Sequence, residues 1–164
     1  MSRYVRIRLA VKRDVSTIEK SISEWLNWEI PREESIRRAI RKKELLVADQ
    51  QENVIGFIHQ VMHDDIIDGG LNSFVTCFYV ASEFRSAGVG SRLLRRAIRD
   101  ASGKGAVGIE VSTASPDARR FYERHHFKQF MGNGKMGEVF LELDLEECER
   151  ALLAGLKKPR KISS

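Results

Sequence analysis

The sequence has few of the residues that mark stapled, repetitive or membrane-spanning proteins. Only two of its 164 residues are cysteines, Cys77 and Cys148, and they lack the paired spacings of zinc sites and disulfide frameworks. No run approaches 18 apolar residues, and the N-terminus lacks the continuous apolar segment of a signal peptide. We therefore expect reduced thiols, no membrane association and a cytoplasmic protein.

Low-complexity segments, internal repeats and linkers are also missing, so one globular domain is expected. His59 and His63 lie four apart on a predicted strand and share a face, but no third ligand has a matching spacing, and we expect no metal site.

Charged residues of both signs are plentiful, with 28 Lys and Arg against 23 Asp and Glu, which gives a net charge of +5. That excess suits a polyanionic partner, either nucleic acid or a phosphorylated cofactor.

The hydrophobic periodicity predicts alternating strands and helices. Residues 4–11 alternate apolar and polar side chains as a half-buried strand does, and helical spacing follows from Asp14, a candidate N-cap. The later elements expected are a helix from Pro31 to about Lys43, two strands flanking Asp49–Asn53, strand Ser73–Ala81, a helix from Val89 to about Gly103, strand Ala106–Thr113, a short helix capped by Ser115, and strands Phe127–Met131 and Val139–Leu145. This order predicts a mixed α/β layered domain, in which Ser73–Ala81 and Ala106–Thr113 are parallel strands of a right-handed crossover.

The C-terminal segment has a different character. Leu145–Leu156 has helical apolar spacing and leads into a basic run at residues 157–161, which we interpret as a solvated end. The expected division is a main domain over residues 1–145 and a C-terminal helix and basic tail over residues 146–164.

The stretch FRSAGVGSRLL, at the junction between a strand and a helix, is the main functional candidate. Small residues at the start of a helix expose backbone N–H groups, and Gly88 and Gly90 let a phosphate approach without a Cβ in its way. Five arginines, Arg85, Arg92, Arg95, Arg96 and Arg99, stand near one acid, Asp100. A tight turn alone would also explain the glycines. The P-loop and dinucleotide fingerprints are excluded, because no GK[ST] follows and Leu93 replaces the third glycine.

Arg85-x-x-Gly88-x-Gly90 resembles motif A, [RQ]-x-x-G-x-[GA], of the GNAT superfamily of acetyl-CoA-dependent N-acetyltransferases. SPDARRFYERHHF, residues 115–127, is similar to a second segment of that family, and the element order from Tyr4 to Leu145 is similar to the whole family fold. The resemblance implies a mostly antiparallel central sheet of about seven strands with a splayed parallel pair, flanked by about four helices, plus a C-terminal helix.

The resemblance also implies how acetyl-CoA is held: its pyrophosphate on the glycine turn, and its pantetheine arm between the strand before the turn and the parallel strand after the helix. Arg92, Arg95 or Arg96 would approach the 3′-phosphate. The residues expected to bind acetyl-CoA are Phe78, Tyr79, Val80, Arg85, Ser86, Ala87, Gly88, Val89, Gly90, Ser91, Arg92, Ser115, Ala118, Phe121 and Tyr122.

Two catalytic groups follow from the same resemblance. Tyr122 matches the tyrosine that returns a proton to the departing thiolate, and the N–H of Val80 would polarise the acetyl carbonyl. Packing in the core is the other interpretation of Tyr122. The chain departs from the motif at Ser115, which replaces asparagine, and at His126, which replaces glycine and would have to adopt a left-handed conformation.

The general base and the acceptor are less well marked. The strand SFVTCFYVA contains no acid, so the family's usual glutamate base is missing, and Glu110, His63, Asp64 and Asp65 are the substitutes, Glu110 being our choice. Trp25, Trp28 and Glu29, after the first helix, would attract and pack a cationic amine, with Asp64 as a further substrate residue. Core tryptophans and helix-capping glutamates would explain the same residues.

We therefore predict an N-acetyltransferase that acts by direct transfer on a primary amine, either a small molecule or a protein amine. One alternative is an acyl-CoA sensor that has lost its base. The other is a nucleic-acid-binding protein that uses the arginine helix and basic tail and shows a steep salt dependence of affinity. A homodimer stays open.

Overall fold

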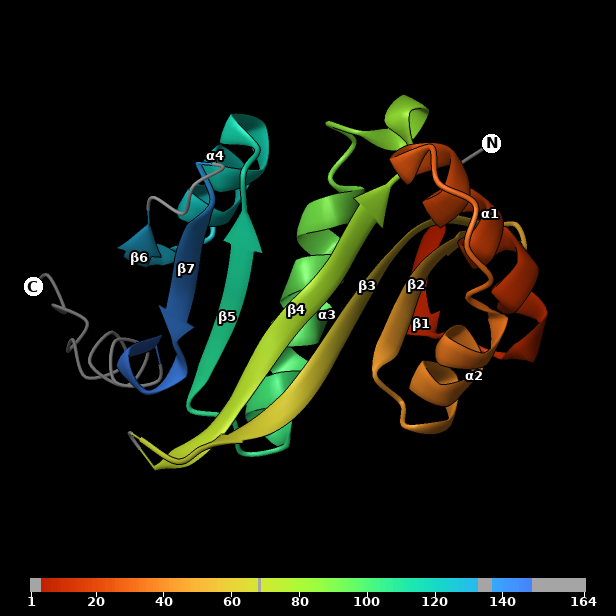
Figure 1. Cartoon of the computed structure of the whole chain (residues 1–164). Coiled ribbons are helices and arrows are strands. Elements are labelled where there is room, and N and C mark those ends of the chain that lie inside the picture. Colours follow the sequence, from red (N-terminus) through yellow and green to blue (C-terminus); the bar gives the residue numbers. More distant parts are fainter. Residues whose placement is uncertain (1–3, 68, 133–136, 149–164) are drawn as a thin grey trace, which may run out of the picture. The chain divides into compact units, whose positions relative to one another are not determined.

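The computed structural model describes residues 4–67, 69–132 and 137–148, which form a mixed sheet and its covering helices (Figure 1). The order of the strands is β1-β2-β3-β4-β5-β7-β6, with β4 and β5 as the parallel pair and the other neighbours antiparallel. The elements are β1 Val5–Leu9, α1 Val15–Leu26, α2 Glu33–Arg41, β2 Leu45–Gln50, β3 Asn53–Asp65, β4 Gly70–Val80, α3 Val89–Gly103, β5 Gly108–Thr113, α4 Pro116–Arg124, β6 Lys128–Gly132 and β7 Val139–Asp144.

This architecture confirms the α/β fold class and each strand and helix expected up to residue 145, with β4 beginning earlier than predicted. Residues 145–148 are helical, which agrees with the start of the predicted C-terminal helix. The rest of that helix and the basic tail lie outside the described residues. Within the described ranges, every helix is too short or too polar to cross a bilayer.

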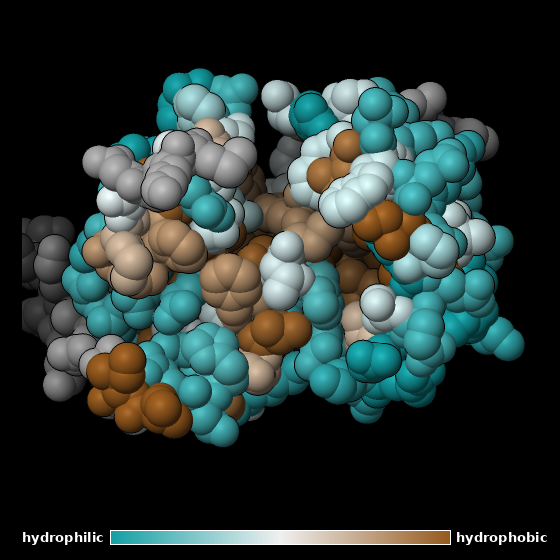
Figure 2. All heavy atoms as spheres, in the orientation of Figure 1, coloured by the Kyte–Doolittle hydropathy of each residue, from teal (hydrophilic) through white to brown (hydrophobic). Residues whose placement is uncertain are grey.

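The chain forms two compact units, Met1–Val61 with Val75–Asp100, and Met62–Phe74 with Ala101–Ser164. We call them the first and the second unit. Figure 2 shows a face that is largely hydrophilic, with hydrophobic side chains in separate patches. Large exposed hydrophobic residues include Ile66 and Ile67 at the β3–β4 turn, which are 94% and 90% exposed.

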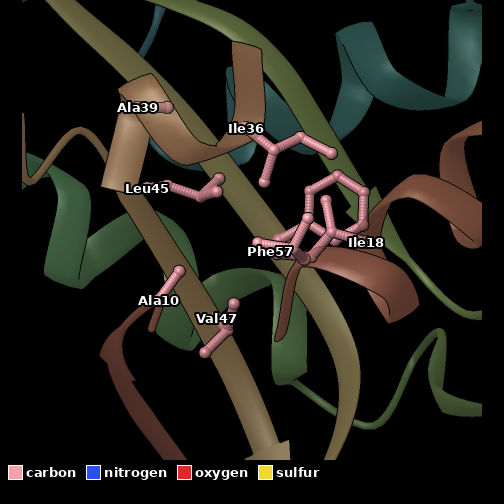
Figure 3. Close-up of a cluster of buried hydrophobic side chains, with 8 residues drawn as sticks. Ala10, Ile18, Ile36, Ala39, Leu45, Val47 and Phe57 are labelled. Carbon is pink, nitrogen blue, oxygen red and sulfur yellow. The ribbon is translucent and has the colours of Figure 1, made fainter. Parts of the chain in front are cut away.

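In the first unit, α1 and α2 cover one face of β2 and β3. Ile18 of α1 and Ile36 of α2 pack with Val47 and Phe57 of the strands (Figure 3). Their spacing on the helices, and the alternation on the strands, place these side chains on facing surfaces. The amphipathic pattern therefore positions both helices on the sheet.

The opposite face of the first unit's sheet carries α3. Leu93, Leu94 and Ala97 are fully buried there. Gln60 of β3 donates its side-chain amide to the carbonyl of Ala97 at 3.1 Å, which satisfies the buried amide group of Gln60. A Cβ on Gly56 would lie 2.9 Å from the carbonyl oxygen of Tyr79, so this strand position needs glycine.

Asp14 occupies the predicted N-cap position of α1, but its carboxylate does not cap that helix, which corrects the expected role. It accepts hydrogen bonds from Arg8 at 2.7 and 2.9 Å and from the Val11 N–H at 2.8 Å. Arg8 also donates to Asp49 at 2.8 Å. Burial alone would raise the pKa of both carboxyls, but the Arg8 hydrogen bonds and charge outweigh burial and lower them.

The second unit is built on β5 and β7, whose alternating residues form its core. Ile109 pairs with Leu143 and Val111 with Leu141, and all four side chains are buried. Ser115 caps α4, accepting the Ala118 N–H at 3.3 Å, as predicted. His126, at the end of α4, has φ of 69°, which confirms the expected left-handed conformation.

Candidate functional site

The glycine turn lies between β4 and α3 in the first unit. Residues 85–88 are exposed, and Val89, which is buried, begins the helix. Gly88 has φ of 78° and Ser86 has φ of 65°, so the turn uses the left-handed region twice. Gly88 suits this conformation, whereas Ser86 is a strained position that the sequence pattern did not reveal.

The hydrogen bonds of two backbone amides define where the turn ends and the helix begins. The Arg92 N–H donates to the carbonyl of Gly88 at 3.1 Å, so the N–H groups of Val89 and Gly90 have no acceptor four residues earlier within the helix. The Ala87 N–H donates to the carbonyl of Phe84 at 3.4 Å, a long bond. A helix start of this kind presents donors and a positive dipole to an anion.

Three of the arginines near the turn make contacts within the protein. Arg85 donates from Nε to the carbonyl of Val80 at 3.0 Å, and Arg92 donates to the carbonyl of Val5 at 2.6 Å. Arg96 forms an ion pair with Asp100 at 2.8 Å. Arg95 and Arg99 are exposed on α3. Arg85 and Arg92 therefore tie the glycine turn to β4 and β1.

Two side-chain contacts between β3 and β4 indicate a change of register next to the predicted pantetheine residues Phe78, Tyr79 and Val80. His59 Nδ1 forms a hydrogen bond with Thr76 Oγ1, and the ring of Phe57 stacks on Tyr79 with centroids 5.1 Å apart. Residues 57 and 59 share a face of β3, but residues 76 and 79 are three apart. Their pairing therefore includes one extra residue in β4, which is the geometry of a β-bulge.

Trp25 lies at the surface end of an aromatic series. Its ring centroid is 5.7 Å from that of Tyr79, which in turn stacks on the buried Phe57. Trp25 is 46% exposed and Trp28 61% exposed, and Glu29 is also exposed. The two tryptophans are therefore not core residues, which removes that alternative explanation of their presence.

Arg32, which sequence reasoning missed, anchors the loop that follows α1 and carries Trp28. Its guanidinium donates to the carbonyls of Trp28 and Ile30 and to Ser23 Oγ at 2.9 to 3.1 Å. Its backbone N–H donates to Glu19 Oε1 at 2.6 Å. An arginine beside a loop without secondary structure carried no sequence pattern that could have marked it.

The second unit holds the predicted residues of α4 and β5. Tyr122 is 4% exposed, and its ring packs against Phe127 with centroids 5.3 Å apart and against Phe121 at 5.4 Å. Ser115 and Ala118 form the cap of α4. Glu110, half-buried on β5, accepts a hydrogen bond from Asn72 Nδ2 at 3.3 Å, and Asp64 is exposed on β3.

Burial shifts the pKa of the Cys77 thiol and of the His59 side chain. Both cysteines are free, and burial raises the pKa of Cys77 to about 11, so this thiol is protonated at neutral pH. Burial lowers the pKa of His59, and the nearby Glu44 opposes that shift. Among the described residues, no group of three or more His, Cys, Asp or Glu side chains could hold a metal ion.

Comparison with known proteins identifies a family that this chain matches. The model of the acetyltransferase (GNAT) family matches residues 15–127. The acetyltransferase Atu2258 of Agrobacterium fabrum is 30% identical over 83 residues, an alignment that covers 46% of this chain and only 58% of that relative.

Solved structures of similar fold include YncA from Salmonella typhimurium, solved with its cofactor acetyl-CoA, and Ard1 from Thermoplasma volcanium. YncA has a TM-score of 0.73 and 18% identity, covering 87% of this chain and 95% of its own. Ard1 has a TM-score of 0.70 and 17% identity, covering 85% and 97%. Naa50 of Arabidopsis thaliana, in complex with the bisubstrate analogue CoA-Ac-MVNAL, has a TM-score of 0.66 and 16% identity, covering 85% and 98%. At sequence identities of 16% to 18%, these similarities show a shared fold alone.

Proposed function

This chain belongs to the GNAT family of acetyltransferases, and from that premise we propose that it transfers the acetyl group of acetyl-CoA to a primary amine within a ternary complex. The observation that carries the proposal is the exposed glycine turn, with Gly88 in the left-handed region and the first amides of α3 directly after it. These amides would hold the diphosphate of acetyl-CoA. Family membership and turn geometry thus support the same ligand.

The pantetheine arm would run along the end of β4, where the register change lies. A bulge leaves backbone groups outside the regular ladder, and such groups can bond an amide-bearing ligand. Phe78, Tyr79 and Val80 are the residues we propose for this contact, with the N–H of Val80 polarising the acetyl carbonyl. Ser115, Ala118 and Phe121 would complete the cofactor contacts.

The reaction needs one proton removed and one supplied. The acceptor ammonium loses a proton to a base, for which we propose Glu110, and the neutral nitrogen attacks the acetyl carbon. The bond between carbon and sulfur breaks, and the CoA thiolate takes up a proton, for which we propose the hydroxyl of Tyr122. A positioned acid of this kind contributes about 10² to 10⁴ in rate.

For the acceptor, we propose an amine with an apolar or aromatic part. Trp25 and Trp28 offer exposed aromatic surface, and Glu29 and Asp64 add negative charge that attracts a cation. The bisubstrate analogue bound by Naa50 joins CoA to a peptide. A protein N-terminus, a lysine and a small aromatic amine are the acceptors to compare here.

The test is release of CoA from acetyl-CoA in the presence of a panel of these amines, followed by mass spectrometry of the products. Tyr122→Phe should lower kcat by about 10² or more, because only the proton donor is lost. Tyr4→Phe, at a tyrosine that is 71% exposed, is the matched control and should leave kcat unchanged. Tight acetyl-CoA binding without turnover of any amine would instead favour the sensor.

A further inference from the structure

His59 of β3 lies between two polar side chains of the first unit. Its Nδ1 forms a hydrogen bond with Oγ1 of Thr76 on β4, and its Nε2 lies 3.6 Å from Oε2 of Glu44, the residue before β2. The hydroxyl oxygen of Thr76 also lies 3.4 Å from the carbonyl oxygen of His59. Residue 59 therefore fixes Thr76 through its ring and through its backbone.

The surroundings of the ring decide which of its nitrogens accepts a hydrogen bond. Burial lowers the pKa of His59, Glu44 opposes that shift and Lys42 adds to it, so the ring is neutral at pH 7 and carries one N–H. Nε2 is buried and lies beside a carboxylate, which favours the hydrogen on Nε2. A distance of 3.6 Å is too long for a normal hydrogen bond, so Glu44 acts through its charge. Nδ1 is then the acceptor of the Thr76 hydroxyl.

Thr76 marks one end of the register change in β4. At the other end, the ring of Tyr79 stacks on Phe57, and the N–H of Ala81 donates to the carbonyl of Ile55 at 2.9 Å. These two contacts follow one register between β3 and β4, whereas the pair that includes Thr76 is one residue out of it. The extra residue of β4 therefore lies between Thr76 and Tyr79.

The place of this register change matters for the backbone groups beside it. If Thr76 were not held, β4 could pair with β3 in the unshifted register, in which Cys77 stands opposite residue 59. A slip of one residue turns side chains to opposite faces of a sheet, so the bond to Thr76 discriminates between the two pairings. A bulge leaves backbone groups outside the ladder, and its place decides whether they belong to Phe78.

We infer that His59 is a positioning residue for the cofactor: by holding Thr76 it fixes the register change, and so aligns the backbone of residues 78–80 with the pantetheine arm. The inference rests on the proposed binding of acetyl-CoA and adds a residue that acts through Thr76. His59 lies on β3, outside the glycine turn and outside the two segments that resemble family motifs. Its effect should therefore appear in binding of the arm and not in binding of the diphosphate.

Two ligands separate these contributions to binding. CoA carries the pantetheine arm, and adenosine 3′-phosphate 5′-diphosphate has the same nucleotide without it. In titration calorimetry on the full chain, His59→Ala should bind CoA about fivefold to tenfold more weakly than the wild type does, which is the effect of one lost hydrogen bond. Its affinity for the shorter ligand should be unchanged, which also shows that the variant is folded. Equal losses for both ligands, or no loss for CoA, would overturn the inference.

Further variants test whether the bond to Thr76 carries the effect. Thr76→Val removes the hydroxyl, keeps a β-branched side chain and should reproduce the loss for CoA. His59→Asn should restore CoA binding, because the asparagine amide has a polar atom as many bonds from Cα as Nδ1 is. The double variant His59→Ala/Thr76→Val should bind CoA as well as either single variant, because one bond is lost in all three; additive losses would contradict this. Thr17→Val, at an exposed threonine of α1, is the matched control and should change neither affinity.

The backbone can also be followed without a ligand by ¹⁵N NMR. The amide signals of Phe78, Tyr79 and Val80 should shift in His59→Ala and return towards their wild-type positions in His59→Asn. Signals that stay in place in His59→Ala would overturn the inference whatever the ligands do. If the wild type binds neither ligand, the acetyl-CoA proposal fails and this inference fails with it. If the wild type binds both ligands and the variants lack the expected difference between them, the inference fails alone.

Discussion

Replacing Gly88 by alanine separates the two explanations of the glycine turn, an anion cradle and a simple tight turn. Gly88 has φ of 78°, where an L side chain costs about 1–2 kcal/mol. No atom lies within 4 Å of the position of the added Cβ, so steric overlap adds nothing. Alanine also restricts the unfolded chain, which offsets about 0.4–1 kcal/mol. The net loss of unfolding free energy should therefore be about 1 kcal/mol.

The effect on acetyl-CoA affinity should be larger than this modest loss of stability suggests. The new methyl group would point into open space beside the first amides of α3, which is where the diphosphate must approach. We expect affinity measured by calorimetry to fall at least tenfold, which corresponds to about 1.4 kcal/mol. Urea denaturation of the same sample gives the unfolding free energy and shows that the variant is folded.

The matched control is Gly103→Ala, at the other end of the same helix. Gly103 also has open space around its added Cβ but is not in the left-handed region, so alanine should not destabilise the protein there. Its affinity for acetyl-CoA should equal that of the wild type. If Gly88→Ala and Gly103→Ala bind acetyl-CoA equally well, the glycine only turns the chain and our reasoning about the cradle is refuted.

Two further predictions concern the first unit. Arg8→Met should cost about 3–5 kcal/mol of unfolding free energy at pH 7, because two buried carboxylates lose their cation. Arg8 holds the pKa of Asp14 and of Asp49 below the usual value of an aspartate, so their contribution to stability is complete above that usual value and is lost as pH falls through the folded-state values. Urea titrations that show equal acid sensitivity of wild type and variant would contradict this. Arg32→Ala should raise KM for the amine several-fold and leave acetyl-CoA affinity unchanged, because the loop that carries Trp28 loses three hydrogen bonds of the Arg32 guanidinium. Unchanged steady-state kinetics would show that the loop does not meet the acceptor.

Most of the fold could be predicted because it follows from local periodicity. The alternation in β1 and β7 and the helical stripes of α2 and α3 each report which side of an element is buried, and this information is present in short windows of sequence. The cap at Ser115 and the left-handed His126 were predicted because turn and cap chemistry is also local.

The features that the sequence did not reveal depend on pairing between distant segments. Asp14 has the residue type and the position of an N-cap, but its carboxylate accepts hydrogen bonds from Arg8 instead of capping the helix. The register change in β4 becomes visible only when β3 is placed beside it. Glu142 opposes Glu110 because of a register that no single strand specifies. Such contacts require the assembled sheet before they can be recognised.

The most direct test of the account follows the backbone amides of residues 87–91 by ¹⁵N NMR during titration with CoA, 3′-dephospho-CoA and pantetheine. Because the diphosphate is shared by the first two ligands and absent from the third, both nucleotides should shift these amide signals to saturation and pantetheine should not. Amide signals in this turn that stay in place while CoA binds elsewhere would contradict the central claim that α3 begins at a diphosphate site.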